Sequence, residues 1–214
     1  MATWLHIRCP LIAGIVFFLA LWFACADALA TGSKHVLVLY SFGRETRPWT
    51  DYAQSIRAEL ERQSPWPLEI TDQSLVSATS GDEGSEGPFV EYLDALFAKH
   101  PLDLIVAVGG PAASFVQRHR GQLFATTPMI LTAVEQRRVQ YSILTANDAV
   151  VPLRIDFFAD IQNILRVLPD TKNIAVVVGT SPIERFWREE IRKDVMPFAD
   201  RVSFTFYDDL LATY

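Results

Sequence analysis

The sequence DLIVAVGGPAASF, residues 103–115, decides the fold class. Residues 104–108 form a continuous apolar run, which is typical of a strand that is covered on both faces in a parallel sheet. Gly109 and Gly110 then predict a tight turn, and Pro111 suits the first turn of a helix. This order places backbone N–H groups at the carboxyl edge of a parallel sheet, where open α/β folds bind ligands. The alternative is that the two glycines serve the turn alone.

The alternation of strand and helix extends along the chain on both sides of this stretch. We expect strands at residues 35–40, 68–71, 104–108 and 128–133, and helices at 52–63, 88–100 and 111–119, with Gly121 as the last helix stop. The strand at 68–71 is expected near an edge of the sheet. Because the connections are short enough for right-handed crossovers, residues 31–147 predict an N-terminal α/β unit with a doubly wound parallel sheet.

Residues 148–214 predict a partial second α/β unit. Before it, residues 141–144 are expected to form a further strand or an edge segment. After it begins, we expect a helix at 158–168, a strand buried on both faces at 173–178, a helix at 182–195 and a strand at 201–207. Ser181 and Glu184 have the spacing of a capping box at the start of the second of these helices. Two strands and two helices leave a strand edge unpaired, so we expect a truncated chain or one that a partner completes.

Residues 1–30 have the pattern of a secretory signal peptide. An apolar run at residues 11–24 is followed by small residues, with residues 28–30, Ala-Leu-Ala, as the best cleavage tripeptide. The alternative is a retained membrane anchor, because the run is near the lower length limit for crossing a bilayer. We therefore expect a periplasmic or exported protein, or one anchored in the inner membrane and facing the periplasm. Both cysteines, Cys9 and Cys25, lie in this leader, so the rest of the chain forms no disulfide and no thiolate site.

Composition and motifs argue against several classes of function. The formal charge is −6, whereas non-specific nucleic-acid binding depends on clustered Lys and Arg. The sequence contains no P-loop, no G-x-G-x-x-G after a strand and no G-x-S-x-G elbow. His35, His100 and His119 lack the spacing of metal ligands. We therefore expect no catalysis, no cofactor, no metal and no nucleic-acid partner.

The loops at the carboxyl ends of the strands face one crevice in this topology. The candidate ligand-binding residues lie in these loops: Ser41, Phe42, Arg44, Gly109, Gly110, Pro111, Ala133, Glu135, Gly179, Thr180 and Ser181. They supply N–H groups, hydroxyls, an aromatic ring, one cation and one anion, which suits binding better than catalysis. Arg44 could clamp a carboxylate or phosphate, or it could pair with Glu45. Phe42 and Trp49 could stack on a ligand or cover the sheet edge.

Three stretches resemble one protein family. VLVLYS at 36–41, VAVGGPA at 106–112 and VLPDTKNIAVVVGTSPIERFW at 167–187 look like ABC-transporter substrate-binding proteins of the type I periplasmic-binding fold. They look most like the group that also serves as extracytoplasmic sensor domains of bacterial histidine kinases. The resemblance implies two lobes, a hinge and a small ligand in the cleft. Closure of the lobes on the ligand is then the conformational change that a partner detects. This chain departs from the family pattern because it ends before the second lobe is complete.

The resemblance and the residues together favour an exported solute-binding or sensor module that serves transport or signal transduction without catalysis. Its implied partners are a small-molecule ligand and a membrane permease or a sensor kinase. A fragment of a membrane-anchored, histidine-kinase-type receptor is the first alternative. An exported α/β enzyme is the second.

Overall fold

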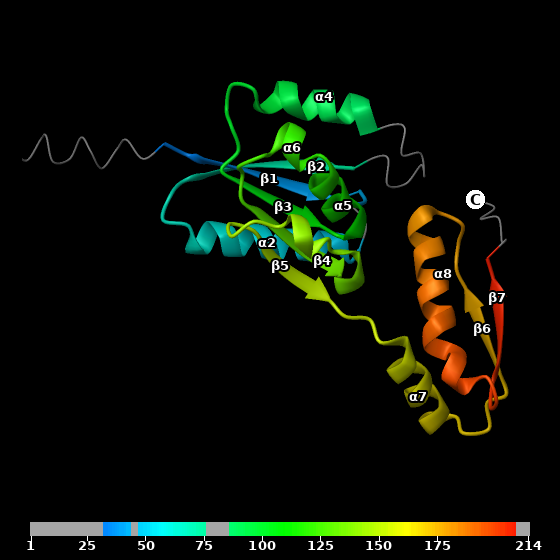
Figure 1. Cartoon of the computed structure of the whole chain (residues 1–214). Coiled ribbons are helices and arrows are strands. Elements are labelled where there is room, and N and C mark those ends of the chain that lie inside the picture. Colours follow the sequence, from blue (N-terminus) through cyan, green and yellow to red (C-terminus); the bar gives the residue numbers. More distant parts are fainter. Residues whose placement is uncertain (1–31, 44–46, 76–85, 209–214) are drawn as a thin grey trace, which may run out of the picture.

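The computed structural model describes residues 32–43, 47–75 and 86–208. They form two α/β units, one around a five-stranded sheet and one around a two-stranded sheet (Figure 1). Every pair of neighbouring strands in both sheets is parallel. The predicted fold class, a doubly wound parallel α/β fold with a smaller second lobe, is therefore confirmed. Within the described ranges, no helix is long and apolar enough to cross a membrane, and the predicted leader at 1–30 lies outside them.

The first unit is built on a sheet with the strand order β2-β1-β3-β4-β5. Its strands are β1 Lys34–Tyr40, β2 Leu68–Ser74, β3 Leu104–Val108, β4 Met129–Glu135 and β5 Ala149–Leu153. The second strand lies at an edge, as its sequence pattern predicts. The order places the carboxyl ends of the central strands β1, β3 and β4 side by side, which is the arrangement that creates a ligand crevice in open α/β sheets.

Helices cover both faces of this sheet. Helix α2 Trp49–Gln63 packs on one face, and α4 Glu86–Phe97, α5 Gly110–Arg118 and α6 Arg120–Leu123 lie on the other (Figure 1). Alternate residues of β3 enter different cores: Ile105 packs beneath α4 and α5, whereas Val106 faces α2. The apolar run at 104–108 is therefore a strand buried on both faces, as predicted.

Two details of the first unit differ from the prediction. Residues 141–144 are not a strand, since Tyr141–Ile143 is a single 3₁₀ turn. The strand that follows β4 in the sheet is instead β5, at Ala149–Leu153. The β5 sequence is AVVPL, in which Pro152 argues against a central strand; proline is tolerated here because β5 is an edge. Gly121 is not a helix stop, because it lies within α6, and α5 has already ended at Arg118.

The extent of the first sheet bears on where the two units divide. Strand β5 pairs with β4 through Leu153, so the five-stranded sheet continues past residue 147, where the sequence pattern weakens. We therefore propose that the boundary between the units lies after Leu153.

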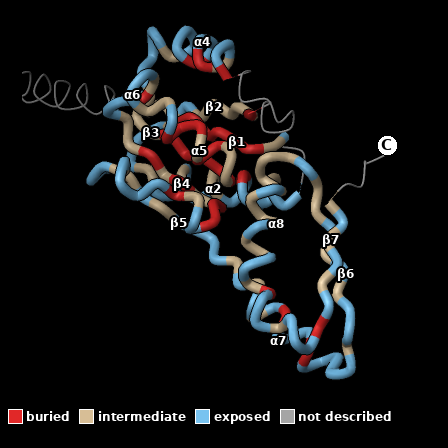
Figure 2. Tube along the Cα trace, turned by 45° about the vertical axis from the view of Figure 1, so that its right-hand side comes forward, coloured by how far each residue is buried: buried red, intermediate tan, exposed pale blue. Residues whose placement is uncertain are grey.

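The second unit consists of α7 Phe157–Val167, β6 Asn173–Val177, α8 Pro182–Val195 and β7 Ser203–Tyr207, with a 3₁₀ turn at Met196–Phe198. Both helices pack on the same face of the sheet, around Ile161, Leu165, Val195 and Val202. Val177 on β6 is 69% exposed, so the prediction that this strand is buried on both faces is wrong. Figure 2 shows that buried residues concentrate in the first unit and are sparse in the second.

The start of α8 confirms the predicted capping box. Ser181 Oγ accepts a hydrogen bond from the Glu184 backbone N–H (3.4 Å), and the Glu184 carboxylate accepts one from the Ser181 backbone N–H (2.9 Å). Pro182 occupies the first helical position, where its missing N–H costs nothing. These contacts fix the end of α8 that faces the first unit.

Candidate functional site

A cavity of about 700 Å³ lies between the two units. It is lined by Phe42, Trp49, Gly110, Pro111, Ala133, Glu135, Arg138, Leu153, Ile155, Ser181, Ile183, Glu184 and Trp187. The first unit contributes the carboxyl ends of its strands and the loops after them, and the second contributes the first two turns of α8. The volume is in the range typical of small-molecule sites.

The glycine turn after β3 brings the backbone to the cavity. Gly109 has φ +91°, and a Cβ there would lie 2.5 Å from Ser41 Oγ and 3.2 Å from the Trp49 ring. Both the conformation and the packing therefore require glycine. Gly110 and Pro111, which begin α5, line the cavity directly.

Ser41 serves the fold rather than the cavity. Its side chain is completely buried, its hydroxyl donates to the Val108 carbonyl (2.8 Å), and its Oγ accepts from the Ala112 backbone N–H (2.9 Å). Ser41 therefore caps the start of α5 from a neighbouring strand, because that N–H has no partner within the helix. Contrary to the expectation that it faces the crevice, Ser41 does not line the cavity.

The end of β4 is distorted where it meets the cavity. Ala133 has φ 52°, and the register between β4 and β5 shifts between Thr132 and Val134. A non-glycine residue in the left-handed region is uncommon, and such residues and bulges are frequent at functional sites. The bulge places both Ala133 and Glu135 at the cavity wall.

Aromatic rings approach the cavity from both units. Phe42 and Trp49 come from the first unit, and their ring centroids are 5.4 Å apart. Trp187 comes from α8 and packs edge-on against Phe186, with centroids 5.1 Å apart. A planar apolar group in the cavity would therefore meet rings of both units.

Charged groups in the cavity wall differ in how well they are paired. Glu135 is 4% exposed and accepts hydrogen bonds from Arg137, through the backbone N–H (2.7 Å) and Nε (2.9 Å). The hydrogen bonds from Ser181 lower the pKa of Glu184 below its ordinary value. Arg138 differs: its Nε is buried and has no hydrogen-bond partner in the described part of the chain. Burial first, and the charge of Arg118 second, lower the pKa of Arg138.

The structure brings part of the predicted set together. Phe42, Gly110, Pro111, Ala133, Glu135 and Ser181 line one cavity. Four predicted residues do not line it: Ser41, Gly109, Gly179 and Thr180. Ser41 and Gly109 hold the turn before α5. Gly179 packs against Glu184, and the Thr180 carbonyl accepts a hydrogen bond from Arg185. Arg44 lies outside the described residues.

Sequence reasoning missed several residues of the wall. Leu153 ends β5 and Ile155 lies just after it, and the sequence pattern does not predict β5 as a strand. Trp187 lies on α8, and nothing local in that sequence shows that α8 faces the first unit. Arg138 had a usable signal, since it closely follows Glu135 at the carboxyl end of β4.

A second cavity, of about 810 Å³, lies between α2 and the sheet. Its wall is mostly apolar and includes Trp66, Leu104 and Ile130. Of its charged groups, Lys34 and Asp103 pair with each other at 2.8 Å, and Glu59 pairs with Arg62. This cavity is the part of the sheet face that α2 leaves open, near the amino ends of the strands, and so it lacks the position at which open α/β sheets bind ligands.

No family model matches the sequence, and no curated protein matches it either. Solved structures do match. A conserved domain protein from Vibrio cholerae is 18% identical over 84% of this chain and 58% of that chain, with a TM-score of 0.58. An ABC domain from Streptococcus pneumoniae in complex with L-Trp is 15% identical over 81% and 56%, with a TM-score of 0.53. A solute-binding protein of an ABC transporter from Rhodopseudomonas palustris, in complex with 3,4-dihydroxybenzoic acid, is 11% identical over 82% and 47%, with a TM-score of 0.52.

These matches identify the fold. The chain spans between 47% and 58% of the length of these three solved structures. A periplasmic binding protein from Burkholderia mallei has a TM-score of 0.56 at 9% identity. The chain therefore has the fold of the solute-binding proteins of ABC transporters, the type I periplasmic-binding-protein fold.

Proposed function

We propose that the protein binds a small molecule in the cavity between its two units and does not change it chemically. The observation that carries this proposal is that one cavity of suitable volume is walled by both units, with aromatic rings on either side. The Ser181 hydroxyl, which lines this cavity, already accepts a hydrogen bond from the Glu184 N–H in the capping box of α8. Among the described residues, no group of three or more His, Cys, Asp or Glu side chains could hold a metal ion. These features support binding over catalysis.

The comparisons support the same proposal through the fold. Two solved structures that share it are complexes with small ligands, L-Trp and 3,4-dihydroxybenzoic acid. In a two-unit fold, closure of the units on a ligand can pass a signal onward. We propose that the protein is exported, on the pattern of residues 1–30. Its partner is then a membrane permease or a sensor kinase.

Calorimetric titration of the whole 214-residue chain tests this function. The probes are L-tryptophan, 3,4-dihydroxybenzoate, D-ribose and adenosine, which represent four chemical classes. We expect at least one of them to bind, and Trp187→Ala to weaken that binding about tenfold or more, because the ring forms part of the cavity wall.

Trp66→Ala is the matched control, because Trp66 lines the other cavity. It should leave the affinity unchanged. Binding that survives Trp187→Ala and is lost in Trp66→Ala would place the ligand under α2 and contradict the proposal. Failure of every probe to bind would contradict it as well.

A further inference from the structure

The charged groups in the wall of the inter-unit cavity differ in whether their hydrogen-bonding atoms have partners. The described charged residues that line it are Glu135, Arg138 and Glu184. Arg137 compensates Glu135 with two hydrogen bonds, and the backbone of Ser181 donates to Glu184. Both carboxylates are thus satisfied within the protein. Arg138 forms no salt bridge with any residue that the structure describes, although the charge of Glu135 acts on it, and its Nε–H has no acceptor among those residues.

The position of Arg138 is fixed by its neighbours. Its guanidinium lies over the Phe186 ring, 5.0 Å from the centroid. On another side it approaches Gly110 so closely that a Cβ there would lie 3.1 Å from Nε. Packing against the ring and the glycine backbone holds the group at the cavity wall, while its Nε–H is buried without an acceptor. A buried donor without a partner costs free energy that an incoming acceptor can recover.

The surroundings of Arg138 favour a single carboxylate. A guanidinium presents parallel N–H groups that match the two oxygens of a carboxylate. At the start of α5, the Ala112 N–H is already bound by Ser41 and Pro111 has no N–H, so these two residues offer a ligand no backbone donor. Because the carboxylates of Glu135 and Glu184 also line the cavity, a singly charged carboxylate meets less repulsion there than a doubly charged phosphate.

The rest of the wall favours a planar apolar body. Phe42, Trp49 and Trp187 present rings, and Leu153, Ile155 and Ile183 present aliphatic side chains. The Ser181 hydroxyl is used by α8. A sugar would therefore find few hydrogen-bond partners for its many hydroxyls, which makes its burial costly.

We propose that the cavity selects a small monocarboxylate attached to a planar apolar ring, and that Arg138 binds the carboxylate. This inference rests on the proposed function of the same cavity. It names the chemical class of the ligand and the residue that recognises its charge.

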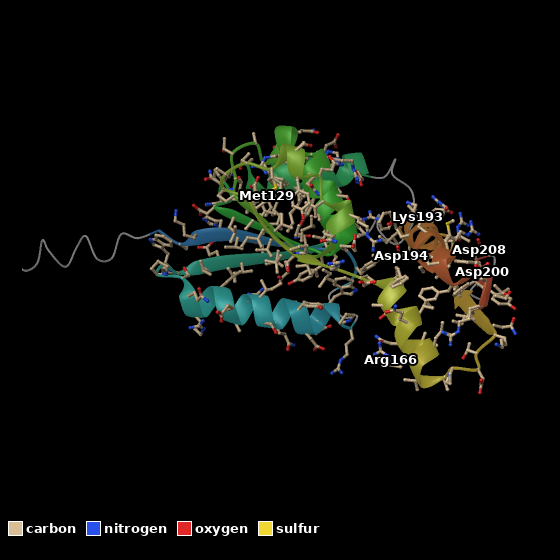
Figure 3. The ribbon with its side chains drawn as sticks, turned by 60° about the horizontal axis from the view of Figure 1, so that its bottom comes forward. Met129, Arg166, Lys193, Asp194, Asp200 and Asp208 are labelled. Atoms are coloured by element: carbon tan, nitrogen blue, oxygen red, sulfur yellow. The ribbon has the colours of Figure 1, made fainter. Side chains whose placement is uncertain are left out.

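The test compares an acid with its neutral amide on the whole 214-residue chain. Indole-3-acetate and indole-3-acetamide share one ring system and differ in charge at one group. Titration calorimetry should show the acid binding about tenfold or more tightly than the amide. Arg138→Gln should remove this preference. Arg166→Gln, on the exposed side of α7 (Figure 3), makes the same change of charge away from the cavity and should preserve it.

The outcomes separate this inference from the function on which it rests. The inference is overturned if the acid and the amide bind equally well to the unchanged chain. It is also overturned if folded Arg138→Gln still prefers the acid. Binding of D-ribose or adenosine, but of neither indole compound, would overturn the ligand class and leave the cavity's binding function standing. If neither the indole compounds nor any of the four earlier probes binds, the binding function itself fails.

Discussion

At Gly109 the backbone conformation and the packing together exclude a side chain. The φ of +91° lies in the region that disfavours residues with a Cβ, and the space where a Cβ would lie is filled by Ser41 and Trp49. Because Ser41 caps α5 and Trp49 forms part of the cavity wall, a disturbance at Gly109 would reach both the helix and the site.

We therefore expect Gly109→Ala to lower the free energy of unfolding by about 1–3 kcal/mol. Gly121→Ala is the control, because Gly121 lies in helix α6 and has nothing within 4 Å of its added Cβ. There the substitution should be neutral or stabilise by up to about 1 kcal/mol. Urea unfolding of both variants measures the difference, and equal effects would show that the turn tolerates a side chain.

Helix α8 is the element that carries the second unit's part of the cavity. Its first turn is held by the capping box of Ser181 and Glu184, and both residues lie at the cavity wall. The hydrogen bonds from Ser181 lower the pKa of Glu184. The folded protein therefore binds a proton at this carboxylate less readily than the unfolded chain does. The resulting stabilisation is present above the unfolded pKa of about 4.3 and is lost as the pH falls through the lower folded value.

Glu184→Gln should make the protein less sensitive to acid. Glutamine keeps the hydrogen-bonding pattern of a capping box but does not titrate. Between about pH 5 and pH 3, the free energy of unfolding should fall less in this variant than in the unchanged chain. Glu91→Gln, at an exposed position of α4, is the control and should leave the pH dependence as it is. Identical profiles for all three proteins would mean that the capping carboxylate carries no such stabilisation.

At the scale of the whole molecule, Arg137 connects the two units. Its Nε donates to Glu135 at the end of β4 (2.9 Å), its Nη1 to Glu190 on α8 (2.7 Å) and its Nη2 to the Ile155 carbonyl between the units (3.1 Å). Asp194, on the same helix, lies 3.8 Å from Nη1 (Figure 3). One guanidinium thus ties the end of a strand, the connection and a helix, and it keeps the two walls of the cavity together.

Much of the fold could be predicted because its signals are local. A continuous apolar run identifies β3 whatever surrounds it, and Ser181 with Glu184 marks the start of α8. Strand β5 could not be predicted in the same way, because AVVPL combines exposed positions with a proline that only an edge position permits.

The candidate site was harder to predict than the fold, because its walls meet through contacts distant in sequence. The topology rule places Gly110 and Glu135 at one edge of the sheet, and both line the cavity. The rule says nothing about the direction of a hydroxyl, so it could not show that Ser41 turns inward to cap α5. It also could not show that α8 brings Trp187 against the first unit.

The most direct test of the central claim, that the ligand binds between the units, is ¹⁹F NMR of the whole chain labelled with 5-fluorotryptophan. Trp49 and Trp187 line the inter-unit cavity from opposite units, whereas Trp66 lines the cavity under α2. Single Trp→Phe variants assign the signals. On titration with a bound probe, the signals of Trp49 and Trp187 should shift together while that of Trp66 stays in place. A shift of Trp66 alone would contradict the account.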